Sequence, residues 1–100
     1  MKAALVELGY WGKTILPILK SLENSLNFEL QHVCDNHKKN LSECIKNWPS
    51  TIIHSDFYKL IDSEKIDLVF ITTGIDTHYN LVKKSLENGC HTFVDRKSVV

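Results

Sequence analysis

Five short apolar segments recur along the chain, and a stretch with helical spacing separates each from the next. Most of them contain β-branched or aromatic residues, which is typical of strands. They lie at residues 3–6, 28–34, 51–53, 68–71 and 92–94. A tight hairpin cannot connect parallel strands, so strict alternation of strand and helix predicts a parallel sheet with helical crossovers.

The order of the strands follows from the handedness of these crossovers. Right-handed connections leave few topologies for a chain of this pattern. We predict a doubly wound α/β fold of the Rossmann type, with five strands in spatial order 3-2-1-4-5 and helices flanking both faces. Segments 3–6 and 68–71 are apolar throughout, so these two strands are expected to be buried on both faces.

Apolar residues three and four positions apart predict which side of each helix faces the sheet. The first helix is expected to begin near Gly12 or Lys13, which would put Pro17 close to the first turn, where its missing N–H matters little. A shorter helix is predicted over residues 56–62, and Gly89 is predicted to end the last helix. The sheet-facing positions of the first helix are expected to be Ile15, Ile18, Leu19, Leu22 and Leu26.

Composition excludes several classes of protein. The 100 residues are about the size of one domain, and 12 basic and 12 acidic side chains cancel, so the chain lacks the charge of a nucleic-acid binder. The first acidic residue, Glu7, follows only four apolar residues, and no apolar run approaches the roughly 20 residues of a membrane span. We therefore expect a cytoplasmic protein with no nucleic-acid or membrane partner.

The three cysteines indicate neither a disulfide framework nor a metal site. Cys34, Cys44 and Cys90 are odd in number, and their spacing matches no zinc motif. All three are predicted to be reduced packing residues.

A glycine-containing turn follows the first strand. Gly9 and Gly12 hold the second and third glycine positions of the G-x-G-x-x-G fingerprint, with Tyr10 and Trp11 between them and Glu7 at the first position. In that fingerprint these glycines let the backbone approach a pyrophosphate at the N-terminus of the helix. The turn therefore predicts a dinucleotide site, and the alternative is a plain strand-to-helix turn.

An acidic residue at the end of the second strand supports the dinucleotide interpretation. Asp35 falls 26 residues after Gly9, near the roughly 20-residue offset at which an acid binds the adenosine ribose hydroxyls. Asn36 follows it, and residues 37–39 include no arginine that could accept the 2′-phosphate of NADP. We therefore expect NAD rather than NADP, the alternative for Asp35 being a cap of the next turn or helix.

Five motifs along the chain together resemble those of one enzyme family. They lie at residues 9–13, 33–35, 66–71, 72–79 and 89–94. In this order they are similar to the N-terminal domain of the Gfo/Idh/MocA oxidoreductases, the family of glucose–fructose oxidoreductase and inositol dehydrogenase. The resemblance implies a single NAD(P)-binding Rossmann domain over residues 1–100, followed in complete family members by an α/β substrate domain that makes the oligomer contacts. That second domain is expected to be absent from this chain.

The resemblance also implies further cofactor-binding residues. Thr72, Thr73 and Gly74 match the turn that lies beside the nicotinamide in the family, although proline is usual where Gly74 stands. His78 matches the histidine that commonly follows at the start of the next helix, and packing against the loop is the alternative role for it.

The last strand ends at Asp95, Arg96 and Lys97, where family members usually carry Glu-Lys-Pro. The resemblance makes Asp95 a cofactor-binding residue and puts Arg96 in place of the lysine that assists proton transfer. Arginine stays protonated, so it can hold a hydroxyl but cannot readily relay a proton. Lys97 is the second catalytic candidate, although neighbouring residues of an extended chain point to opposite faces.

The resemblance thus implies the NAD-binding domain of an oxidoreductase that transfers a hydride between the cofactor and a sugar, inositol or related polyol. The 100 residues alone are expected to be inactive. Two alternatives remain: a non-catalytic nucleotide- or sugar-nucleotide-binding module with a degenerate site, and a free-standing α/β domain that binds a partner.

Overall fold

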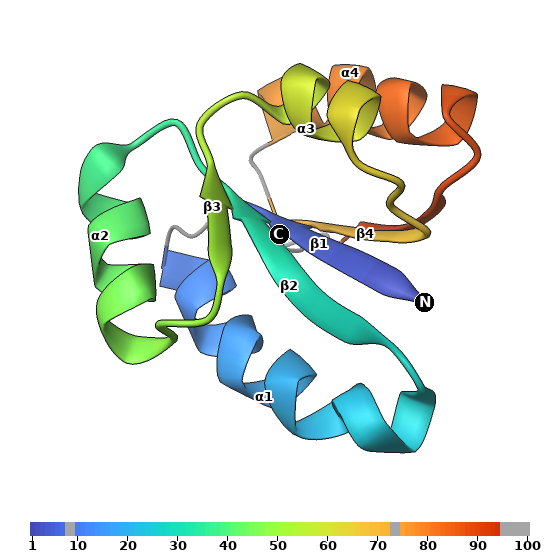
Figure 1. Ribbon diagram of the computed structural model, residues 1–100. Coiled ribbons are helices and arrows are strands. Elements are labelled where there is room, and N and C mark those ends of the chain that lie inside the picture. Colours follow the sequence, from blue (N-terminus) through green and yellow to red (C-terminus); the bar gives the residue numbers. More distant parts are fainter. Residues whose placement is uncertain (8–9, 73–74, 95–100) are drawn as a thin grey trace, which may run out of the picture.

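A computed structural model describes residues 1–7, 10–72 and 75–94, and the side chains of residues 10–12 and 75–78 lie outside that description. The strands are β1 (Lys2–Val6), β2 (Glu29–Cys34), β3 (Ile52–His54), β4 (Leu68–Ile71) and β5 (His91–Val94). The helices are α1 (Tyr10–Leu26), α2 (Lys38–Asn47), α3 (Phe57–Ser63) and α4 (Ile75–Glu87). The strands form one sheet in the order β3-β2-β1-β4-β5, and every neighbouring pair is parallel. Figure 1 shows β3, β2, β1 and β4 in this order. The predicted Rossmann topology is therefore confirmed.

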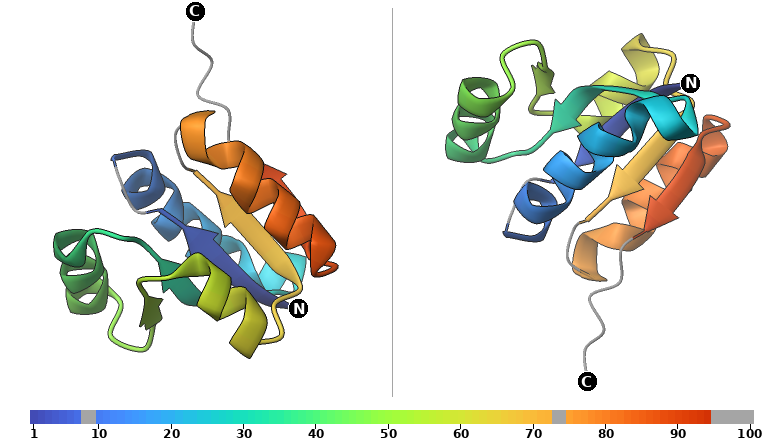
Figure 2. Two further views of the ribbon diagram at one scale, coloured as in Figure 1. Left: turned by 90° about the horizontal axis from the view of Figure 1, so that it is seen from above. Right: turned by 90° about the horizontal axis from the view of Figure 1, so that it is seen from below.

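The helices form two layers, one on each face of the sheet (Figure 2). Successive residues of a strand point to opposite faces, so β1 supplies Ala3 and Leu5 to the core under α1 and α2. Its alternate residues Ala4 and Val6 pack in the core under α3 and α4. Residues 3–6 are at most 3% exposed, so burial of this strand on both faces is confirmed.

Helix α1 begins at Tyr10, earlier than the sequence suggests, so the expectation that Pro17 lies close to the first turn is wrong. Pro17 is the eighth residue of the helix, and the helix continues through it. Its ring lies on an exposed side of α1, where water can satisfy the carbonyl that loses its donor.

The predicted inner side of α1 is also only partly right. Leu19 is buried as expected. Leu16, which is not among the expected positions, is also buried, whereas Ile18, Leu22 and Leu26 are 53%, 37% and 58% exposed. Apolar residues occupy more of the helix circumference than the sheet can cover, so periodicity alone does not fix the side that is buried.

Two residues with left-handed backbone end the long helices. Asn27 follows α1 with φ 55°, and Gly89 follows α4 with φ 78°. The amides after them bond five residues back, from Phe28 to the Glu23 carbonyl at 3.1 Å and from Cys90 to the Ser85 carbonyl at 3.0 Å. This is the pattern of a Schellman cap, and the predicted stop at Gly89 is confirmed.

The remaining predictions from composition concern cysteines and membrane spans. Cys34, Cys44 and Cys90 are buried free thiols, as predicted. Within the part of the chain that the structure describes, no helix is long and apolar enough to cross a membrane.

Candidate functional site

A cavity of about 180 Å³ opens at the carboxyl ends of β1, β2 and β3, beside the start of α3. Its lining residues are Val6, Glu7, Cys34, Asp35, Asn36, Ser55, Phe57, Tyr58 and Leu81. The strand order reverses at β1, which lies between β2 and β4. In open α/β sheets, ligands bind outside the carboxyl ends of the strands at such a switch point.

Asp35 is the buried acid of this cavity, and its side chain is 2% exposed. Its Oδ1 accepts a hydrogen bond from the His37 backbone amide at 2.8 Å, and His37 Nδ1 lies 3.3 Å from the same oxygen. Asn40 Nδ2 donates to Oδ2 at 3.0 Å, and the Asp35 amide donates to the His54 carbonyl at 3.0 Å. A buried carboxylate needs such partners. Asp35 therefore both lines the cavity and fastens the turn that leads into α2.

Glu7 lies at the opening of the turn after β1, and its backbone has φ 73°. This left-handed conformation is the one that the fingerprint's first glycine adopts without steric cost. The Glu7 amide donates to the Cys34 carbonyl at 2.7 Å, which extends the pairing of β1 and β2 into the cavity wall.

Thr72 ties the end of β4 to the end of β1. Its hydroxyl lies 2.7 Å from the Glu7 carbonyl and 3.1 Å from that of Val6 and can donate to either, and its amide donates to the Val6 carbonyl at 3.2 Å. The side chain therefore holds the backbone where a phosphate turn would begin.

The thiol of Cys34 also lines the cavity, but it is not a nucleophile. Burial, reinforced by the nearby carboxylates of Asp35, Asp56 and Glu7, raises the pKa of this thiol to about 12. Cys34 stays protonated at physiological pH and acts as a packing residue.

Ser55 and Tyr58 are lining residues that the sequence did not reveal. They flank Asp56, whose side chain caps α3 by accepting from the Tyr58 amide at 2.9 Å and the Lys59 amide at 3.2 Å. An Asp after a strand and before an apolar helix is a capping signal. That signal could have marked the β3–α3 turn as part of the cavity at the strand ends.

The structure brings together Asp35 and Asn36 in the cavity and fixes Thr72 beside it. Tyr10, Trp11 and Gly12 form the first turn of α1, and His78 lies in the first turn of α4, but their side chains fall outside the described residues. Six other predicted site residues lie wholly outside the described ranges: Gly9, Thr73, Gly74, Asp95, Arg96 and Lys97.

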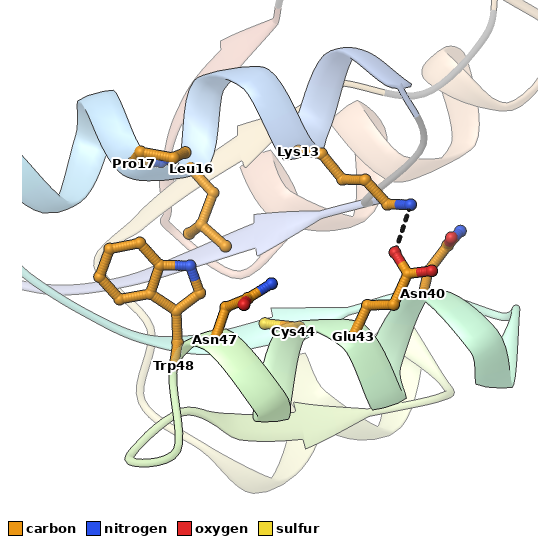
Figure 3. A pocket seen from close by; sticks show the side chains of 8 residues that line it. All are labelled: Lys13, Leu16, Pro17, Asn40, Glu43, Cys44, Asn47 and Trp48. Atoms are coloured by element: carbon orange, nitrogen blue, oxygen red, sulfur yellow. Dashed lines mark ion pairs between the residues drawn. The ribbon is translucent and has the colours of Figure 1, made fainter.

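A second cavity, of about 250 Å³, lies between α1 and α2 (Figure 3). Lys13 of α1 and Glu43 of α2 form an ion pair across it, with 2.6 Å between Nζ and Oε2. The hydrogen bond from Lys13 lowers the pKa of the Glu43 carboxyl. Leu16, Pro17, Asn40, Cys44, Asn47 and Trp48 complete the lining. Among the described residues, no strand end contributes to this lining, so the arrangement is that of a gap between packed helices rather than of a site at the sheet edge.

Solved structures with the same fold come from several oxidoreductases. An oxidoreductase from Thermotoga maritima aligns with a TM-score of 0.84 at 23% identity, over 96% of this chain and 29% of that one. Scyllo-inositol dehydrogenase from Lactobacillus casei, solved with NAD(H) and scyllo-inositol, aligns with a TM-score of 0.77 at 24% identity, over 94% of this chain and 27% of that one. The chain thus spans less than a third of either protein.

Sequence comparison points in the same direction. The uncharacterized oxidoreductase YdgJ of Escherichia coli K12 is 39% identical over 54 residues, which are 54% of this chain and 16% of that protein. Residues 1–96 match the model of the Gfo/Idh/MocA family, described as an oxidoreductase family with an NAD-binding Rossmann fold. Since this match covers almost the whole chain, the protein belongs to the Gfo/Idh/MocA oxidoreductases and carries their NAD-binding Rossmann domain.

Proposed function

We propose that this domain binds NAD in the cavity at the carboxyl ends of β1, β2 and β3, and that the protein carrying it oxidises or reduces a sugar, inositol or related polyol. The observation that carries the first half is the buried carboxylate of Asp35 on the cavity wall. A carboxylate at the end of the second strand is the group that accepts hydrogen bonds from the adenosine ribose hydroxyls.

The preference for NAD over NADP follows from charge. The carboxylate of Asp35 would lie beside a 2′-phosphate and repel it, and Asn36, the next residue of the cavity, carries no compensating charge. Lys38 and Lys39 begin α2, but no arginine is present in this region to form a bidentate phosphate contact.

The residues at the two sides of the cavity fit the other parts of a dinucleotide. α1 begins at Tyr10, four residues after β1 ends, and its first backbone N–H groups are suited to a pyrophosphate. Ser55 and Tyr58 line the cavity beside α3, where we propose that they face the adenosine end. For the nicotinamide end we propose the turn formed by Thr72, Thr73 and Gly74, together with His78.

The substrate class rests on the family and on its solved members. The Lactobacillus casei neighbour contains scyllo-inositol, and a further neighbour is the myo-inositol 2-dehydrogenase of Lactobacillus plantarum. Bound NAD would accept the hydride from a carbinol carbon as the hydroxyl proton leaves to a base, which yields a carbonyl. We propose that Arg96 holds a substrate hydroxyl near this centre and that Lys97 or a residue of the substrate domain exchanges the proton.

Cofactor binding is tested by titrating the chain with NADH, with calorimetry and tryptophan fluorescence as the two readouts. The proposal predicts saturable binding that Asp35→Ala weakens about tenfold or more, because a charged hydrogen-bond acceptor is lost. Absence of binding up to millimolar NADH would reject it. Asn47→Ala, in the cavity between α1 and α2, is the matched control and leaves the affinity unchanged.

The second function is a nucleotide-binding module without catalysis. Glu7 favours this second function. It lines the proposed cofactor cavity, and its carboxylate would repel the phosphates of a dinucleotide, which an ordinary enzyme of this family would avoid. Assay of the protein that carries this domain against a panel of polyols and sugars with NAD separates the two functions. Turnover of any compound in the panel supports the enzyme. If the protein binds NADH but shows no turnover, and Arg96→Lys restores turnover, the degenerate site is supported.

A further inference from the structure

Asn40 contacts Asp35 from outside the cavity at the ends of the strands. It is the third residue of α2, and its side chain reaches back five residues, so that Nδ2 lies 3.0 Å from Asp35 Oδ2. Asn40 does not line the cavity of Asp35 and Asn36, so its contact with that site runs through the carboxylate.

The two oxygens of Asp35 are held by different residues. The backbone amide of His37 donates to Oδ1 at 2.8 Å, and the amide group of Asn40 donates to Oδ2. The terminal torsion of an aspartate is broad, so a bond to one oxygen fixes the plane of the carboxylate less than bonds to both oxygens do. A second donor on the other oxygen restricts that rotation.

We propose that Asn40 is a positioning residue: it fixes the plane of the Asp35 carboxylate and thereby sets the preference for a ribose 2′-hydroxyl over a 2′-phosphate. This inference rests on the proposed binding of NAD by Asp35. Asn40 itself touches no ligand. A carboxylate held in one plane presents its oxygens to the hydroxyls without losing torsional freedom on binding, which is the general advantage of a pre-organised site.

The test compares ligands that differ only at the 2′ position. Asn40→Leu keeps the size of the side chain and removes the donor, and Asn40→Gln keeps an amide donor on a longer stem. Calorimetry with ADP and with 2′-deoxy-ADP measures the ribose contact, and NADH against NADPH measures the preference. Asn47→Leu is the matched control, since Asn47 ends the same helix.

We expect Asn40→Leu to weaken the binding of ADP and NADH about threefold to tenfold, as for a lost hydrogen bond to a charged group. The ratio of the affinities for NADH and NADPH should decrease by a similar factor. Affinity for 2′-deoxy-ADP should stay within about twofold, since the hydroxyl that Asp35 would bind is missing. Asn40→Gln should recover part of the loss, and Asn47→Leu should behave as the wild type.

A double-mutant cycle separates positioning from structural damage. In an Asp35→Ala background, Asn40→Leu should cause no further loss of ADP affinity, because the group through which it acts is gone. If Asn40→Leu does not fold, as judged by circular dichroism, Asn40→Ala takes its place in the same cycle.

If the wild-type chain binds ADP and NADH, either of two results overturns the inference. One is an unchanged affinity of Asn40→Leu for ADP, and the other is an equal loss of its affinity for ADP and for 2′-deoxy-ADP. A wild-type chain that binds neither ADP nor NADH is a different outcome. It rejects the proposed function, and the role of Asn40 with it.

Discussion

The hydroxyl of Thr72, at the end of β4, lies within hydrogen-bonding distance, 2.7 Å, of the backbone carbonyl of Glu7, at the end of β1. The two residues are 65 positions apart in the chain, yet this contact joins the central strand β1 to its neighbour β4 at their carboxyl ends. The hydroxyl is also 3.1 Å from the Val6 carbonyl, so the side chain spans Val6 and Glu7, the last described residues before α1. The backbone that leaves β1 is therefore also held by the end of β4.

Thr72→Val should destabilise the domain by about 1 kcal/mol, because an isosteric side chain without a hydroxyl leaves a partly buried carbonyl without its donor. Urea unfolding at pH 7 measures the change. Thr92→Val is the matched control, because its hydroxyl donates to the Cys90 carbonyl two residues away at 3.3 Å, a longer and more local contact whose loss should cost less. Equal effects of the two substitutions would contradict the role given to Thr72.

Glu7→Gly should stabilise the domain by roughly 0.5–1 kcal/mol, because glycine adopts the φ of 73° without steric cost. It should also raise NADH affinity about threefold by removing a negative charge from the cavity. Asn27→Gly is the control, since Asn27 has the other left-handed non-glycine backbone in the described residues and lies at the far end of α1. Asn27→Gly should leave NADH affinity unchanged, and a gain of affinity in both variants would contradict the charge argument.

Acid should destabilise the domain through the pair formed by His32 and His54, whose Nδ1 and Nε2 lie 3.0 Å apart. Burial is the main cause that lowers the pKa of each ring. The charge of Lys2 lowers the pKa of His32 further, and His32 lowers that of His54 further, whereas the carboxylate of Glu64 raises both pKa values. The pair is neutral in the folded and unfolded states at pH 8. As the pH falls through the ordinary histidine value of 6.5, the unfolded chain takes up protons first, so the free energy of unfolding decreases.

Urea unfolding between pH 8 and pH 5 checks this expectation. A His32→Gln and His54→Gln double variant should flatten the pH dependence in that window. His91→Gln, which replaces an exposed ring on β5, is the control variant. A double variant with the wild-type slope would show that other groups cause the dependence.

The fold could be predicted from the sequence because its signals are local and repeated. Each strand is a short apolar segment, and each crossover carries helical spacing, so the topology follows once handedness is applied. The place of Asp35 at the carboxyl end of a strand could be predicted in the same way, because an acid follows an apolar segment directly. The buried side of α1 was not, because apolar side chains surround much of that helix and only the packed sheet decides that Leu16 is buried and Ile18 is exposed.

The rest of the site depends on contacts between distant elements. Ser55 and Tyr58 reach the cavity because a three-residue strand and a short capped helix place them beside Asp35, about twenty positions earlier in the chain. The contact of Asn40 with Asp35 requires the turn between β2 and α2, which sequence periodicity does not describe.

The most direct test of the account is a titration of the isotopically labelled chain with NAD. The measured quantity is the change in chemical shift of each backbone amide in the NMR spectrum. We predict that the largest shifts cluster at Glu7, Asp35, Asn36, Ser55 and Tyr58, around the cavity at the strand ends. Shifts centred instead on Asn47 and Trp48, between α1 and α2, or no shifts at millimolar NAD, would contradict the assignment of the cofactor site.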